Sequence, residues 1–415
     1  MHSFTVLFIV LLAAGLALRL WLLRRQVCSV QAHRERVPDA FAGTITPQQH
    51  ARAADYTIAH ARHGAVQLVA GAAVLLLLTV AGGIAAIDAW TARTVTGELL
   101  QGVATVGATA SVLALTGLPF DAWSTFRIEA RFGFNRTTPA LFAQDLLKGL
   151  VLSAGLLLPL VALLLWLMPR AGVAWWLWAW AAWATFSILL SWAWPRLIAP
   201  WFNRFRELEP GAMREAVESL ARRCGFEPRG VFVMDGSRRS THGNAYFTGL
   251  GRAKRIVFLD TLLEALAPVE VQAVLAHELG HFRLRHVAWR IVFSLVAAFA
   301  GFAALAWLAR QPWFQPALGV VDGGPHTLLL LFALTAPVFL LPVGPLAAWW
   351  SRRHEFEADE YAARHADAEA LAHALVKLYR DNATTLTPDP LYTAFHASHP
   401  PALARIARLT AGRRR

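Results

Sequence analysis

The chain of 415 residues has little charge, and this shortage argues against a soluble protein. Only 16% of its residues are Asp, Glu, Lys or Arg, whereas 56% are hydrophobic and 17 are Trp. Soluble domains usually carry about 25% charged residues. The composition therefore indicates an integral membrane protein that lies in a lipid bilayer.

Cysteine is scarce as well. Cys28 and Cys224 are the two cysteines, so the sequence provides neither a disulfide framework nor a cysteine zinc site. Internal repeats and low-complexity tracts are absent too. Although the net charge is +12, no base-stacking or groove-reading motif accompanies it, and a nucleic-acid partner is therefore excluded.

Long apolar runs, in contrast, are abundant. A membrane helix needs about 20 apolar residues, and the first such run is predicted to be a retained helix, because its basic residues follow the run and do not precede it. We predict seven membrane segments, at approximately 3–23, 65–90, 97–118, 146–168, 173–195, 287–309 and 326–350.

Basic residues are distributed unequally between the two sides of these segments. If the first segment runs from outside to inside, the inner parts of the chain hold 33 Lys and Arg and the outer loops hold three. Cytoplasmic loops of membrane proteins carry the excess of basic residues. We therefore expect the N-terminus outside and the C-terminus on the cytosolic side.

Two stretches, 196–285 and 351–415, are polar enough to fold in water. The first contains an amphipathic helical pattern, "PGAMREAVESLARRCGF", and then the β-rich pieces "GVFVMD", "NAYFTGL" and "RIVFLD". These pieces predict a hairpin or a three-stranded sheet, with the turn at Gly249 to Arg252. Such a sheet has an exposed edge.

The motif HELGH begins at His277 and ends at His281. On a helix these two imidazoles project from one face about one turn apart, so that they can hold a single metal ion. Glu278 can reach a water molecule on that ion. The spacing predicts one catalytic Zn²⁺ per chain.

A catalytic zinc usually has three protein ligands and one open position. A third His six residues after His281 would fall at Val287, which excludes that arrangement. His286 lies about 140° around a continuous helix from His281. We therefore predict that His286 is an interfacial residue that faces away from the metal.

The segment "SRRHEFEADEYAARHA" offers a carboxylate as the third ligand. Glu355 and Asp359 are four residues apart on one helix face, so we predict that Glu355 binds zinc and that Asp359 orients a ligand histidine. Glu357 is predicted to point elsewhere. Taken alone, this helix could simply present a solvated charged face.

HELGH, two membrane segments and "SRRHEFEAD" together resemble the integral-membrane CAAX prenyl protease type I family, which are zinc endopeptidases of the Glu-ligand zincin class. The resemblance extends to "RFGFNRTTPALFAQD", "NAYFTG" and "HASHPPALARI". It implies an α-helical polytopic membrane protein with seven transmembrane helices around a large water-filled chamber, and a small α+β zinc-peptidase domain on the cytosolic side. The corresponding division is an N-terminal membrane region with five helices at 1–195 and a zinc metallopeptidase domain at 196–415. The second part includes two further membrane helices, at about 287–309 and 326–350, and a C-terminal helical region.

The resemblance also implies roles for individual residues. Glu278 takes a proton from the attacking water and passes it to the leaving amine. His399 lies near the oxyanion and Arg405 belongs to the same catalytic group. The strand that begins Asn244, Ala245 and Tyr246 pairs with the substrate backbone. Without the resemblance, Asn244 is a turn residue, and His399 and Arg405 are a loop histidine and a helix-start arginine.

The resemblance further implies that the HELGH helix can continue into the membrane segment at 287–309, since the site opens to enclosed water. The chain ends in "GRRR" without a retrieval signal of the endoplasmic reticulum. We therefore expect a bacterial inner membrane as its location.

Three functions are compatible with these patterns. The first is an endopeptidase that cleaves peptides or proteins, prenylated CAAX-type substrates among them, near the C-terminus. The second is a heat-shock type protease for membrane-protein quality control, which shares the chemistry but has fewer membrane segments and is not expected to carry "GFNRTT". The third is a transporter or channel in which HELGH is incidental, and it is disfavoured because charges within the membrane segments are nearly absent.

Overall fold

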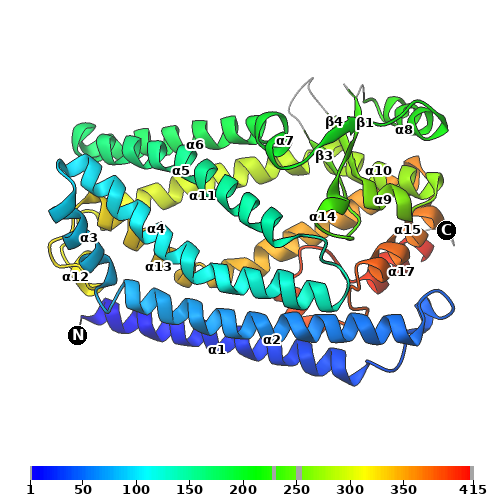
Figure 1. Ribbon diagram of the computed structural model, residues 1–415, viewed down its shortest axis with the longest axis horizontal. Coiled ribbons are helices and arrows are strands. Elements are labelled where there is room, and N and C mark those ends of the chain that lie inside the picture. Colours follow the sequence, from blue (N-terminus) through cyan, green and yellow to red (C-terminus); the bar gives the residue numbers. More distant parts are fainter. Residues whose placement is uncertain (1, 227–229, 249–254, 412–415) are drawn as a thin grey trace.

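The computed structural model describes residues 2–226, 230–248 and 255–411 and is shown in Figure 1. Long helices run along its longest axis. The four strands gather at one end, together with most of the short helices of the C-terminal half, while the N-terminus lies at the other end (Figure 1). The predicted polar regions and the membrane region are thus separated along the length of the molecule.

Among the described residues, six helical stretches are long and apolar enough to cross a membrane, and a bent pair adds a seventh. The bent pair consists of α13 and α14, whose axes differ by 49°. The long helices are α1 (Ser3–Ala32), α2 (Pro47–Leu78), α4 (Glu98–Trp123), α5 (Pro139–Arg170), α6 (Trp175–Ala193), α11 (His286–Leu308), α13 (Pro325–Phe339) and α14 (Gly344–His365). The helical membrane architecture predicted from the sequence is confirmed.

Two predicted segments are interrupted. The prediction of a single helix at 65–90 was wrong, because α2 ends at Leu78 and a separate helix, α3 (Gly83–Thr94), follows. Gly82, which precedes α3, has a φ of 79°. L-residues with side chains rarely adopt this left-handed conformation, so the glycine permits the break. The segment at 326–350 is divided by the short helix η6 (Leu341–Val343), near Pro337 and Pro342, which remove backbone donors.

The membrane helices pack mainly against their neighbours. Contacts join α1 to α2, α4 to α5, α5 to α6 and α6 to α11. Only 11% to 17% of the residues in the apolar windows of the six spans are buried inside the protein. One apolar cluster joins most of these helices and includes Phe8, Ile84, Phe314 and Leu331. It involves α3 and α12 (Phe314–Ala317), which lie at the end of the molecule far from the sheet (Figure 1).

The described residues form a sheet of four strands in the order β1-β2-β4-β3, one more than predicted. The additional strand, β1 (Phe205–Glu207), is antiparallel to β2 (Val231–Met234), and β2 is parallel to β4 (Arg255–Leu259). Among the described strands, β3 (Ala245–Thr248) pairs with β4 alone and is the predicted edge strand. The predicted turn at Gly249 to Arg252 lies outside the described residues.

A second apolar core lies around the sheet. It contains Leu220 of α8 (Ala212–Arg223), Phe258 of β4, and Leu275 and Leu279 of α10 (Pro268–Arg283). Further contributions come from α9 (Asp260–Ala265), α15 (Ala368–Asp381) and α17 (Ala402–Ala411). Helix α10 packs against α8, α14 and α15, so this core fixes the helix that carries HELGH.

Candidate metal centre

Helix α10 is anchored at its first turn. Pro268 occupies the first turn, where its missing N–H removes no intrahelical bond. The carboxylate of Glu270 accepts a hydrogen bond of 2.7 Å from the N–H of Ala267 and forms an ion pair of 2.7 Å with Lys377 of α15. Because the side chain of Glu270 is buried, these contacts fix the start of the helix.

The end of α10 differs from the prediction. The helix stops at Arg283, and Arg285 adopts a left-handed conformation with a φ of 59° before α11 starts at His286. A non-glycine residue in this conformation breaks the helix. HELGH therefore does not continue directly into the next membrane helix, and the expectation of one continuous helix was wrong.

Gly280 of HELGH lies at a close contact between α10 and α14. A Cβ atom at this position would lie 3.1 Å from both the Cα atom of Ala358 and the Cβ atom of Tyr361. Any larger residue would therefore push α14 away. The glycine allows residues of the two helices to meet across a short distance.

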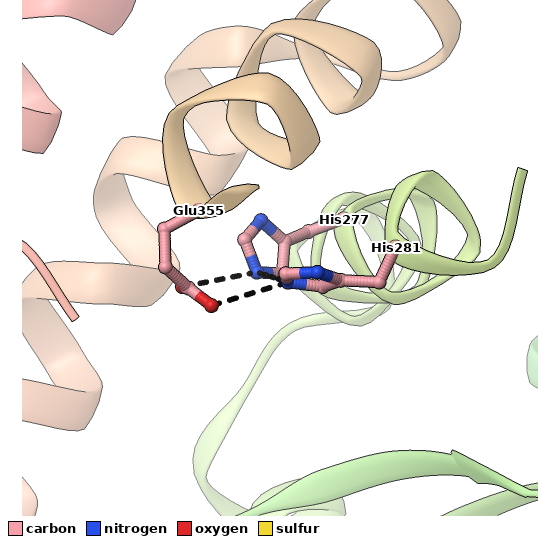
Figure 2. Close-up of side chains that lie close together, drawn as sticks. All are labelled: His277, His281 and Glu355. Carbon is pink, nitrogen blue, oxygen red and sulfur yellow. Dashed lines mark hydrogen bonds and ion pairs between the residues drawn. The ribbon is translucent and has the colours of Figure 1, made fainter. Parts of the chain in front are cut away.

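The side chains of His277 and His281 on α10 meet that of Glu355 on α14 (Figure 2). The two Nε2 atoms lie 3.2 Å apart, Nε2 of His281 lies 3.2 Å from Oε1 of Glu355, and Nε2 of His277 lies 3.6 Å from Oε2. Ligand atoms about 2.0–2.2 Å from a tetrahedral zinc are roughly 3.4 Å apart. The three side chains thus have the spacing of a metal site.

The chemistry of these donors suits a divalent metal ion. Two imidazoles and one carboxylate form a common ligand set of catalytic zinc. Within the described part of the chain, Oε2 of Glu355 is buried and has no hydrogen-bond partner, and its ion-pair contact with Nδ1 of His399 is 2.7 Å long. A buried carboxylate oxygen of this kind fits a metal ligand.

Asp359 lies directly behind His277. Its Oδ1 atom is 2.9 Å from Nδ1 of His277, and the guanidinium of Arg405 forms hydrogen bonds of 2.8 and 2.6 Å to the carboxylate of Asp359. Burial by itself would lower the pKa of His277, but the nearby carboxylates of Asp359 and Glu355 raise it to about 9. The arrangement holds the imidazole so that Nε2 faces His281 and Glu355.

Glu278 is adjacent to this group and has a different environment. Burial raises the pKa of its carboxyl, while the positive charges of His277 and His281 act in the opposite direction. A raised pKa makes the ionised carboxylate a stronger proton acceptor, which suits a general base. The C-terminal segment also reaches this site. The exposed His399 lies just before α17 and contacts Glu355, and Arg405 of α17 contacts Asp359.

The predicted substrate strand lies beside α10. Ala245 and Tyr246 form the start of β3, which contacts α10, and Ala245 pairs with Phe258 of β4. Asn244 is exposed, and its Oδ1 atom accepts a hydrogen bond of 2.8 Å from the N–H of Ala245. Among the described strands, β3 therefore has one edge without a partner strand, and it lies next to the helix of HELGH.

The prediction for His286 was wrong. His286 is buried, its Nδ1 atom lies 3.0 Å from Nδ1 of His281, and its Nε2 atom lies 3.1 Å from Oε2 of Glu357. Its ring stacks on that of His354 with centroids 3.9 Å apart. The helix break at Arg285 turns His286 back toward the site, whereas the predicted angle assumed one continuous helix.

Several membrane-spanning helices, an HExxH helix and a carboxylate from a second helix define the class of membrane-embedded metallopeptidases. Comparison with known proteins leads to the same class. Residues 207–413 match peptidase family M48, and residues 26–204 match the family described as "CAAX prenyl protease N-terminal, five membrane helices". The chain belongs to the M48 family and is an integral membrane metalloendopeptidase.

Individual relatives share most of the chain. The chain is 37% identical over 298 residues to CAAX prenyl protease 1 homolog of Arabidopsis thaliana, a match that covers 70% of this chain and 69% of that protein. Identity to CAAX prenyl protease 1 of Saccharomyces cerevisiae is 33% over 328 residues, with 74% and 72% covered. The crystal structure of S. mikatae Ste24p is 28% identical, with a TM-score of 0.91 and 99% of both chains covered. These matches do not favour the alternative of a heat-shock type protease for membrane-protein quality control.

Proposed function

We propose that this chain is a zinc endopeptidase that cleaves near the C-terminus of prenylated CAAX-type substrates. The observation that carries the proposal is the meeting of His277, His281 and Glu355 beside Glu278. The relatives named CAAX prenyl protease 1 support the substrate class. In a CAAX segment the lipid is attached to the cysteine, so the substrate would present both a peptide and an isoprenyl chain.

The proposed zinc ligands are His277, His281 and Glu355, with one ion per chain. When bound, zinc would polarise the scissile carbonyl and lower the pKa of a coordinated water. Asp359 would accept the Nδ1–H of His277 and keep its Nε2 atom directed at the ion. Arg405 would hold Asp359 in place through its two hydrogen bonds.

Glu278, His399 and the β3 edge would act on the substrate. Glu278 would accept a proton from the attacking water and deliver it to the leaving amine. His399 is close enough to Glu355 to donate a hydrogen bond to the oxygen that becomes negative in the transition state. The edge formed by Asn244, Ala245 and Tyr246 would add the substrate as a further strand.

We further propose that the seven membrane segments surround a water-filled chamber. Because so few residues of the spans are buried inside the protein, many must face either lipid or an internal space. The excess of basic residues at the peptidase end supports a cytosolic location of that end, with the N-terminus outside. We place the protein in a bacterial inner membrane and divide it into a membrane region at 1–195 and a peptidase domain at 196–415.

The proposed function is tested with a farnesylated peptide that ends in a CAAX sequence and the purified chain in detergent. We expect cleavage near the C-terminus, its loss after treatment with a chelator, and its recovery with about one equivalent of Zn²⁺. Addition of Mg²⁺ serves as the control and should restore nothing. Cleavage that survives chelation would contradict the proposal.

A further inference from the structure

A cavity of about 660 Å³ lies between α1, α2 and α13, and the proposed chemistry does not use it. Binding sites for small molecules usually have volumes of about 300–1,000 Å³. The walls of this cavity are mainly aliphatic and include Leu12, Leu16, Leu68, Leu75, Leu334 and Val338. Its size and composition therefore suit a flexible apolar chain.

Two glycines of α2 keep one side of this cavity open. Gly64 and Gly71 both line it, and a Cβ atom built at either position would meet no atom within 4 Å. Because they are seven residues apart, they lie on the same face of the helix. A larger side chain at either position would enter the cavity without a clash with the backbone.

Polar residues line the same cavity near the peptidase domain. Arg19 comes from α1, and Tyr392 and His396, whose rings lie 4.8 Å apart, come from α16 (Pro390–His396). His399 follows three residues later and touches Glu355. Three residues span at most about 11 Å, so the backbone connects the cavity to the metal centre over a short distance.

We propose that this cavity binds the isoprenyl tail of the substrate while the peptide lies at the metal centre. The inference rests on the proposed function, because the lipid of a CAAX substrate is attached to a cysteine close to the C-terminus. The tail and the scissile bond must then be held near each other. The stretch of α1 from Leu11 to Leu23 that lines the cavity is about 18 Å long, which leaves room for an extended tail.

A bilayer acyl chain is the competing occupant. The connection from Tyr392 and His396 to His399 favours the substrate tail, since an occupant that is attached to the peptide must be held close to the catalytic group. An isoprenyl tail in this place would contribute binding energy through burial of apolar surface. Closing the cavity should therefore weaken recognition of the lipidated substrate and leave recognition of a peptide without the lipid unchanged.

The first test fills the cavity by Gly71→Leu and compares a farnesylated peptide with the same peptide without the lipid. We expect the ratio of kcat/KM for the two peptides to fall about tenfold or more, because each buried methylene that is lost costs about fourfold in affinity. Gly155→Leu is the matched control: Gly155 lies on α5, is equally free of neighbours and does not line the cavity. Its ratio should equal that of the wild-type chain. An unchanged ratio in Gly71→Leu overturns the inference.

The second test does not depend on cleavage. A farnesylated peptide with a photoreactive group on its lipid is crosslinked to the Glu278→Gln variant in phospholipid nanodiscs, and the labelled residues are identified by mass spectrometry. We expect labels within 11–23, 64–75 and 334–341, which excess farnesylated peptide removes and extra phospholipid does not. Labels elsewhere, or removal by phospholipid, overturn the inference. Failure of the proposed function would appear separately, as absence of metal-dependent cleavage.

Discussion

At the scale of single residues, the role of Glu278 as general base can be tested by replacing one of its carboxylate oxygens with an amide nitrogen. Glu278→Gln cannot accept a proton, so kcat should fall by about a thousandfold, within the range that general bases contribute. The metal ligands are untouched, and the variant should still bind one metal ion per chain. Cleavage assays combined with metal analysis measure both properties.

The control for this variant is Glu264→Gln, the same exchange at an exposed residue of α9. It should leave kcat and metal content as in the wild-type chain. If Glu278→Gln turned over substrate at a nearly normal rate, another group would have to act as the base.

His286 gives a second prediction. When Nε2 of His281 binds a metal, its Nδ1 atom carries the proton and can donate it to Nδ1 of His286, which lies 3.0 Å away. His286 can in turn donate from Nε2 to Glu357. We therefore expect His286→Ala to weaken metal affinity by about 10- to 100-fold, as measured by competition with a zinc-binding dye.

His286→Asn is the matched variant, because its amide oxygen can replace Nδ1 as the acceptor for His281. It should recover part of the affinity that His286→Ala loses. Equal losses in both variants would mean that His286 acts by packing against His354 and does not position His281.

Local spacing made part of the site predictable. His277, Glu278 and His281 are close in sequence, and Glu355 and Asp359 share a helix face, so both patterns can be recognised from helix geometry alone. His286 could not be placed in this way, because Arg285 has a backbone conformation that its residue type does not indicate. The approach of His399 and Arg405 to α14 depends on long-range packing, and only the family resemblance pointed to it.

At the scale of secondary-structure elements, the contact between α10 and α14 sets the distance between the metal ligands. Gly280→Ala would place a methyl group 3.1 to 3.2 Å from atoms of Ala358 and Tyr361, so the helices must separate. We expect weaker zinc binding and a loss of about 1–3 kcal/mol in the free energy of unfolding, as is typical of overpacking. Zinc titration and thermal unfolding measure these effects.

Gly301→Ala provides the comparison, since Gly301 is a helical glycine of α11 with no neighbour within 4 Å of a built Cβ atom. This variant should keep both zinc affinity and stability. If Gly280→Ala behaved in the same way, close approach of α10 and α14 would not be required for the site.

Most elements followed from hydrophobic patterns. The amphipathic pattern predicted α8, in which Val217, Leu220 and Ala221 are buried. The β-rich pieces predicted β2, β3 and β4, whereas the role of β3 as the substrate-side strand came from the family resemblance. The strand β1 has only three residues, too few to give a periodic signal. The breaks after Leu78 and Phe339 were missed because the apolar runs continue across them.

At the scale of the whole molecule, the distribution of basic residues predicts the orientation in the membrane. A reporter that is active only in the cytoplasm should be on when fused after Arg415 and off when fused to a chain that ends at Gly323. Gly323 lies in the segment between α12 and α13, and α12 is at the end of the molecule opposite the sheet (Figure 1). The reverse pattern would contradict both the topology and the proposed cytosolic position of the peptidase domain.

The central claim is that His277, His281 and Glu355 hold a catalytic metal. The most direct measurement is the zinc content of the purified chain at saturating zinc, determined for the wild type, Glu355→Ala and Glu357→Ala together with their rates of peptide cleavage. We predict one zinc per chain and activity in the wild type, loss of both in Glu355→Ala, and retention of one zinc per chain in Glu357→Ala. Loss of zinc from Glu357→Ala and its retention by Glu355→Ala would contradict the account.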